Sequence, residues 1–94
     1  MSTFDAYRRK IEAELKVLKA EMERLDARLQ GAEADARLWF EKERKAIADK
    51  EAELRRRLDR LEQAGSDALE ELERGVRNAW RDLKTAFERA RDKF

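Results

Sequence analysis

The stretch QGAEADARLWF, residues Gln30 to Phe40, decides between two folds for this chain of 94 residues. It contains Gly31, which suits a turn, yet the alanines and acids that follow are compatible with a helix. Large apolar residues precede it at steps of three and four, the spacing of a heptad seam: Leu15, Leu18, Met22, Leu25 and Leu29. A turn at this stretch predicts three helices, whereas a continuous helix predicts two.

The apolar register continues across the stretch. Ala32, Ala36 and Trp39 fall where a heptad seam places them after Leu29, and Phe40 begins a new register shifted by one residue. A shift of this kind locally relaxes a supercoil without ending the helix. A single glycine inside a helix costs only about 1 kcal/mol relative to alanine. We therefore predict one long helix over about residues 3–63.

A second break follows in the sequence EQAGSDALEE, residues 62–71. Gly65 suits the position just past a helix end, and Asp67 with Glu70 resembles a capping box. We predict a shorter helix over about residues 67–93, with acids in its first turns and bases in its last turns. Its large apolar residues follow an eleven-residue pattern, which suits a nearly straight helix with a broad apolar face. These residues are Leu69, Leu72, Val76, Trp80, Leu83 and Phe87.

These two helices predict an all-α fold in which they form an antiparallel hairpin. The shorter helix covers only the C-terminal half of the long one, so the seam from Phe4 to Leu29 is left bare. An exposed apolar stripe of this length requires a partner. We therefore predict an antiparallel homodimeric bundle, in which two long helices cross at the small residues Ala32, Ala34 and Ala36.

The alternative architecture is a monomeric three-helix bundle with a turn at Gly31. The charges around this glycine support it, because bases stand before it and acids after it, as at the end of one helix and the start of the next. These residues are Arg24, Arg28, Glu33 and Asp35. The unbroken apolar register argues for the long helix instead.

Charged residues make up 48% of the chain, but the net charge is only +1, and each third of the chain is nearly balanced. A nucleic-acid-binding protein carries a basic surplus. The densest basic cluster, Arg55 to Arg57 with Arg60, is interspersed with acids, so nucleic-acid binding is not expected. No apolar run is longer than three residues, the length of Leu38 to Phe40, from which we predict a cytoplasmic protein without a transmembrane segment.

Cysteine and histidine are both absent, which excludes disulfides, thiolate catalysis and most zinc sites. The sequence contains no glycine-rich phosphate loop, and Ser66 has no histidine to activate it. We predict no catalytic, cofactor-binding or metal-binding residues and no enzymatic activity. Residues 1–94 are expected to form a single helical coiled-coil domain.

Two segments carry a resemblance to a known family. The segment AWRDLKTAFERA, residues 79–90, and the segment YRRKIEAELKVLKAEMERLDARL, residues 7–29, resemble small bacterial coiled-coil proteins. Those proteins are described as stress-related and likened to exchangeable apolipoproteins. The resemblance implies a helical hairpin with a role in stress tolerance or in contacts with membranes or partners, and it brings no known catalytic residue or cofactor. Gly31 departs from the corresponding segment of the family, which lacks glycine.

The sequence therefore predicts a non-enzymatic structural or interaction protein that is homo-oligomeric and stress-associated. The alternative is a protein that binds peripherally to a lipid surface, since bases flank the apolar face of the second helix. These bases are Arg77, Arg81, Lys84 and Arg91. The aromatic residues Trp39, Phe40, Trp80 and Phe87 are expected to pack in the core between the helices, with a ligand pocket or a lipid-facing surface as the alternatives.

Overall fold

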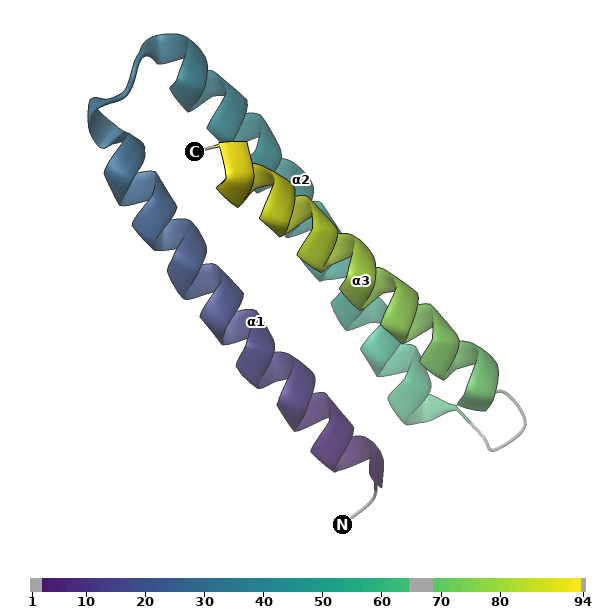
Figure 1. The fold of residues 1–94 in the computed structure, drawn as a ribbon. Coiled ribbons are helices and arrows are strands. Elements are labelled where there is room, and N and C mark those ends of the chain that lie inside the picture. Colours follow the sequence, from purple (N-terminus) through teal and green to yellow (C-terminus); the bar gives the residue numbers. More distant parts are fainter. Residues whose placement is uncertain (1–2, 65–68, 94) are drawn as a thin grey trace.

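The computed structural model describes residues 3–64 and 69–93. Three α-helices, α1 (Thr3–Arg28), α2 (Ala34–Gln63) and α3 (Leu69–Lys93), lie lengthwise beside one another, and a short 3-10 helix, η1 (Leu29–Gly31), stands between α1 and α2 (Figure 1). No strand occurs in these ranges. The prediction of an all-α fold is therefore confirmed. The bundle measures 51 × 20 × 17 Å.

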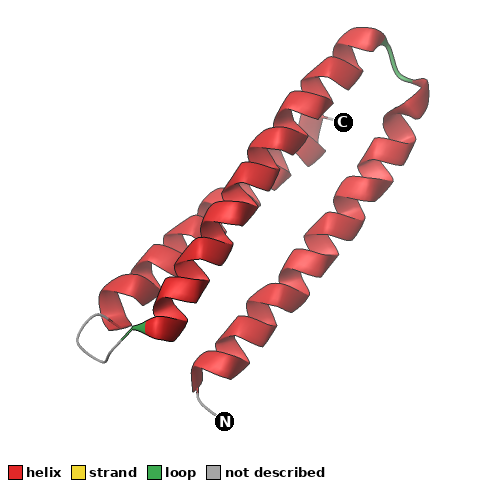
Figure 2. Cartoon of the chain, turned by 180° about the vertical axis from the view of Figure 1, so that it is seen from behind, coloured by secondary structure: helices red, strands yellow, loops and turns green. Residues whose placement is uncertain are grey.

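The predicted long helix over residues 3–63 is wrong, because the chain turns between α1 and α2 (Figure 2). Ala32 and Glu33 are extended, with ψ angles of 164° and 154°. The Ala32 N–H donates to the Leu29 carbonyl oxygen over 3.0 Å, which closes the preceding 3-10 turn. Gly31 itself has no positive φ, so the turn does not depend on the conformational freedom of glycine. The three-helix arrangement predicted as the alternative is the observed one.

The physical reason for the turn is tertiary burial. Folding back places the apolar seam of α1 inside the bundle, where each fully buried large side chain contributes about 1.5–3 kcal/mol. Interrupting a helix loses a few hydrogen bonds whose net value is only about 0.5–1.5 kcal/mol each. Closing the short connection between α1 and α2 costs little chain entropy. Association with a second chain would instead cost translational and rotational entropy. Ala32 and Ala34 consequently lie at the turn and not at a crossing of two long helices.

The backbones of α2 and α3 approach one another closely along their length, and α1 lies further from both. Small buried residues on α3 explain the close approach, because they leave little side chain between the two helices. These residues are Val76, Ala79, Ala86 and Ala90. The predicted antiparallel hairpin is present here, since Lys93 lies over the ring of Trp39 and Arg57 bonds to Gly75. The predicted caps at Gly65, Ser66 and Asp67 lie outside the described residues.

The long side chains of α1 fill the wider space on its side of the bundle. Its heptad seam is buried as the spacing predicts, and it joins the same core as α2 and α3. The buried residues on α1 and η1 are Ile11, Leu15, Met22, Leu25 and Leu29. No stretch of this seam is left bare, so the argument that a second chain must cover it does not apply to the folded bundle.

Candidate functional site

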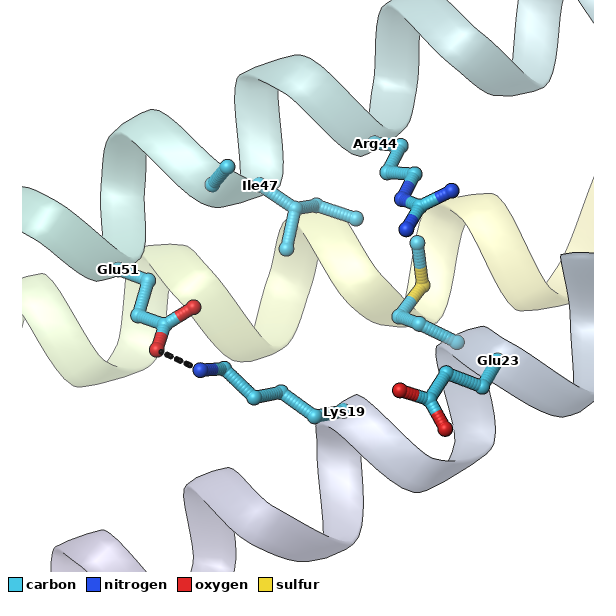
Figure 3. Close-up of a pocket in the computed structure, with 7 residues that line it drawn as sticks. Lys19, Glu23, Arg44, Ile47 and Glu51 are labelled. Atoms are coloured by element: carbon cyan, nitrogen blue, oxygen red, sulfur yellow. Dashed lines mark ion pairs between the residues drawn. The ribbon is translucent and has the colours of Figure 1, made fainter.

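The groove between α1 and α2 is closed by ion pairs. Lys19 Nζ lies 2.9 Å from Glu51 Oε1, and Arg44 Nη1 lies 3.4 Å from Asp26 Oδ2. Figure 3 shows the Lys19–Glu51 pair between the two helices. The hollow that these residues line has a volume of about 270 Å³. Two basic and two acidic side chains line this hollow, so its charge is balanced. Exposed pairs of this kind contribute about 0–1 kcal/mol each, and their effect here is to hold α1 in register with α2.

Arg8 extends the same pattern toward the start of α1. Its guanidinium lies 2.7 Å from Glu62, 3.1 Å from Asp59 and 3.2 Å from Glu12. The hydrogen bond to Glu12 is the main cause of a raised pKa for Arg8, and the α2 acids add to it. Glu51 and Glu53 on α2 have further partners on their own helix, namely Arg55, Arg56 and Arg57. Four interhelical ion pairs therefore cross the α1/α2 side, although Lys16 and Arg55 also line a hollow there with Glu12 and Lys19.

The groove between α1 and α3 has a different character. One hollow of about 220 Å³ lies between Glu14, Val17 and Leu18 on α1 and Trp80 and Lys84 on α3. Val17 is 57% exposed, and Trp80 is half-buried against the core. The Lys84 ammonium lies 5.9 Å from the centre of the Trp80 ring, within the range of a cation–π contact. Most of this hollow is apolar, with charges at its rim.

A second hollow of about 230 Å³ lies further along the same groove, nearer the α1–α2 turn. Its floor consists of Leu25 and Phe87, both buried. Arg24 and Arg28 on α1 and Arg91 on α3 surround this floor, with Glu21 as the acid among them. A third hollow continues onto the outer side of α3 and is lined by Arg77, Trp80, Arg81, Lys84, Thr85 and Glu88. We call the surface formed by these three hollows the α1/α3 face.

The charges of the α1/α3 face are not matched. Six basic and three acidic side chains line its hollows. Between residues 7–28 of α1 and the described residues of α3, no ion pair is formed. Within the described ranges, Arg91 pairs with its neighbour Asp92 at 3.5 Å, while Arg24, Arg28, Arg77 and Arg81 form no ion pair. The fold therefore gathers a basic surplus that the balanced sequence does not reveal.

Tyr7 on α1 lines none of these three hollows, but it packs against the core and is influenced by charges on α3. Burial raises the pKa of its hydroxyl, Arg77 opposes that rise, and Glu73 and Glu14 add to it. Because Arg77 and Glu73 belong to α3, the hydroxyl senses charges from both helices of the groove. Its titration therefore reports on the electrostatics of the α1/α3 face.

The aromatic residues divide into two groups. Phe40 and Phe87 are buried in the core, as predicted. Trp39 and Trp80 are only half-buried, although both pack against that core. The sequence singled out no site residue, and it missed Val17, Arg24 and Arg28. A usable signal was present, because Val17 is an apolar residue beside the heptad seam and not in it.

In the part of the chain that the structure describes, no three acidic side chains lie together as a metal ion requires. None of the described helices combines the length and the apolar character needed to cross a membrane. Comparisons with protein-family models, with curated proteins and with solved structures find no match to this chain. The candidate site is therefore interpreted from its own residues.

Proposed function

We propose that this protein is a non-enzymatic interaction module that holds a partner against the α1/α3 face. The observation that supports this function is the contrast between its two grooves. On the α1/α2 side, four ion pairs join the two helices. On the α1/α3 face, an exposed valine and a half-buried tryptophan lie in a hollow with Lys84 and Glu14. No ion pair crosses this groove between residues 7–28 of α1 and the described residues of α3.

The residue types of the α1/α3 face are those of binding surfaces. Tryptophan and arginine are enriched at the residues that dominate binding energy in protein interfaces. Apolar side chains with a charged rim match the usual anatomy of such interfaces, in which a desolvated centre is surrounded by polar residues. Trp80 supplies the aromatic anchor, and Arg24, Arg28 and Lys84 supply the rim.

A second copy of the chain is one candidate partner, in keeping with the expected homo-oligomer. In that case two intact bundles would associate, since no long helix is available to exchange. The resemblance to stress-related proteins gives the module a cellular context, and we expect a deletion strain to grow more slowly than its parent under heat or oxidant. Equal growth of the two strains would contradict a role in stress tolerance, but it would leave the proposed binding function unaffected.

The test uses two matched positions. Val17 and Leu38 are both 57% exposed, and Val17 alone lies on the α1/α3 face. A photo-crosslinking amino acid is placed at one position or the other in the cells that express the chain. The proposal expects a discrete adduct from position 17 and none from position 38. An adduct of twice the chain mass would identify a second copy as the partner. Identical adduct patterns from both positions would disprove a specific binding face.

Binding to an anionic lipid surface is a second candidate, favoured by the bases around Trp80, namely Arg77, Arg81 and Lys84. The apolar residues of α3 are buried in the bundle, so lipid binding by the folded protein would rest mainly on charge. We expect weak co-sedimentation with phosphatidylserine vesicles that disappears as salt is added. Absence of co-sedimentation at low salt would remove this candidate.

A further inference from the structure

The two hollows between α1 and α3 repeat with the period of a heptad. On α1 their floors lie at Leu18 and Leu25, and on α3 they lie at Trp80 and Phe87. Both pairs are separated by seven residues, which is two helical turns or about 10 Å along the axis. The hollows are therefore spaced to receive two side chains that stand seven residues apart on one approaching helix.

The size of the hollows also suits side chains. Each measures about 220–230 Å³. Small-molecule sites are usually enclosed clefts of roughly 300–1,000 Å³. In helical bundles, by contrast, a single side chain enters a space formed by residues of the facing helices. A groove between two packed helices is also the place where another helix adds to a bundle.

The charge of the α1/α3 face indicates which kind of helix can bind to it. The hollows and the adjoining outer side of α3 carry six basic and three acidic side chains, so a bound helix needs acids beside its apolar stripe. Two copies of this face placed together would oppose one basic surplus with another. A flat lipid surface would meet the rim of the face, but it would not fill two concave hollows. These features favour an acidic helix over both alternatives.

We propose that the α1/α3 face docks an acidic amphipathic helix, which adds to the bundle as a fourth helix. Apolar residues at positions i and i+7 of that helix enter the hollows at Leu18–Trp80 and Leu25–Phe87. Its glutamates or aspartates pair with Arg24, Arg28, Lys84 and Arg91. This inference rests on the proposed function and names the class of partner.

The probe is a synthetic peptide of about 20 residues, which is long enough to span both hollows. Leucines recur in it at steps of three and four, and glutamates flank them. The control peptide has lysine in place of every glutamate. Isothermal titration calorimetry measures affinity, and amide chemical shifts locate the contact. We expect the acidic peptide to bind, with shifts at Val17, Trp80 and Phe87, and the basic peptide not to bind. Equal binding of both peptides, or binding of neither, overturns the proposal.

Two double variants separate this face from general electrostatics. Arg24→Glu with Arg28→Glu reverses two charges of the α1/α3 face, and we expect it to weaken peptide binding about tenfold or more. Lys42→Glu with Lys45→Glu makes the same change at exposed positions of α2, and we expect little effect. Circular dichroism verifies that both variants fold. An equal loss of affinity in the two variants would contradict the proposal.

The interaction module and the acidic helix as its partner can fail separately in these experiments. Position-17 crosslinks without peptide binding would retain the interaction module and exclude the acidic helix as its partner. Binding to phosphatidylserine vesicles but not to the peptide would likewise overturn the helix proposal in favour of a lipid surface. If neither position-17 crosslinks nor a peptide complex formed, the proposal that the protein is an interaction module would be wrong.

Discussion

Tyr7 is the one tyrosine of the chain, so its ionisation can be followed without interference from a second phenol. Burial holds its pKa above the ordinary value of about 10. The folded state thus binds this proton more tightly than the unfolded state. The corresponding stability is fully present below the ordinary pKa and is lost as pH rises through the raised pKa.

We expect the ultraviolet titration of tyrosinate to have its midpoint above 10 in the folded protein and near 10 in denaturant. Arg77→Ala should raise the midpoint further, because Arg77 favours the ionised hydroxyl. Tyr7→Phe should remove this part of the alkaline destabilisation. A folded-state midpoint at or below the denatured value would show that burial does not control this group.

Gly75 is a residue at which the sequence is not optimal for stability. It lies inside α3, where glycine costs about 0.5–1 kcal/mol relative to alanine. An added Cβ would lie 3.8 Å from Arg57 Nη1, an ordinary van der Waals distance. Arg57 Nη1 also donates to the Gly75 carbonyl oxygen over 2.8 Å, and this bond does not involve the added methyl group.

Gly75→Ala should therefore raise the free energy of unfolding by about 0.5–1 kcal/mol and raise Tm by several degrees. Urea denaturation followed by circular dichroism measures the change. Gly31→Ala is the matched control, because it adds the same methyl group in open space outside the α-helices, and we expect a smaller gain. A lower stability for Gly75→Ala would mean that the contact with Arg57 is tighter than the distances indicate.

At the scale of elements, α1 differs from the other two helices in how it is held. Its backbone stands apart from α2 and α3, whereas those two helices approach closely. Long apolar side chains and ion pairs to α2 hold it in place, with Arg8 joining the first turns of α1 to Asp59 and Glu62. Local opening of a folded protein begins where contacts are fewest.

We expect native-state hydrogen exchange to be faster in α1 than in α2 and α3. Arg8→Ala should accelerate exchange in the first half of α1 and leave α3 unchanged. Arg55→Ala is the control, since Arg55 pairs with Glu51 on its own helix and ties no helix to another among the described residues. Equal protection of all three helices would show that α1 is as firmly integrated as the hairpin.

The turn between α1 and α2 is the element that sequence patterns could not decide. The heptad spacing of Leu15 to Leu29 correctly predicts the buried side of α1, and the spacing of Val76, Leu83 and Phe87 does so for α3. Such spacing describes each helix separately. It does not indicate whether consecutive segments are continuous, because Ala32 and Ala36 both satisfy the register, yet Ala32 lies in the turn and Ala36 lies in α2.

The candidate site was equally beyond sequence patterns. Arg24 and Arg28 lie far from Arg91 along the chain, and acids balance each of them locally. Only the packing of α1 beside α3 brings them to one groove and leaves them without acidic partners there. The bases on α3 alone were visible in the sequence as residues that flank an apolar face.

At the scale of the whole molecule, the two architectures differ in length. A helix spanning residues 3–63 would be roughly 90 Å long, at 1.5 Å per residue. The folded chain extends 51 Å and has a radius of gyration of 15.5 Å over its Cα atoms. Small-angle scattering distinguishes these cases for a single chain and for bundles that associate side by side, because such assemblies remain short.

We expect the scattering profile to contain no distances approaching 90 Å, and light scattering on the same sample to give the number of chains. A doubled mass without such distances would indicate a dimer of intact bundles. A doubled mass with them would indicate either the crossed dimer of long helices, which would contradict the turn at residues 29–33, or two bundles joined end to end.

Sequence patterns were sufficient to predict that the chain is helical, where the hairpin partner α3 runs, and which sides of α1 and α3 are buried. These properties follow from local periodicity and charge order, which act over a few residues. The turn at residues 29–33 depends on tertiary packing, because burying the α1 seam outweighs the few helical hydrogen bonds lost there. Tertiary packing also decided that α1 and α3 share a basic groove, because the burial of apolar seams sets which charges become neighbours.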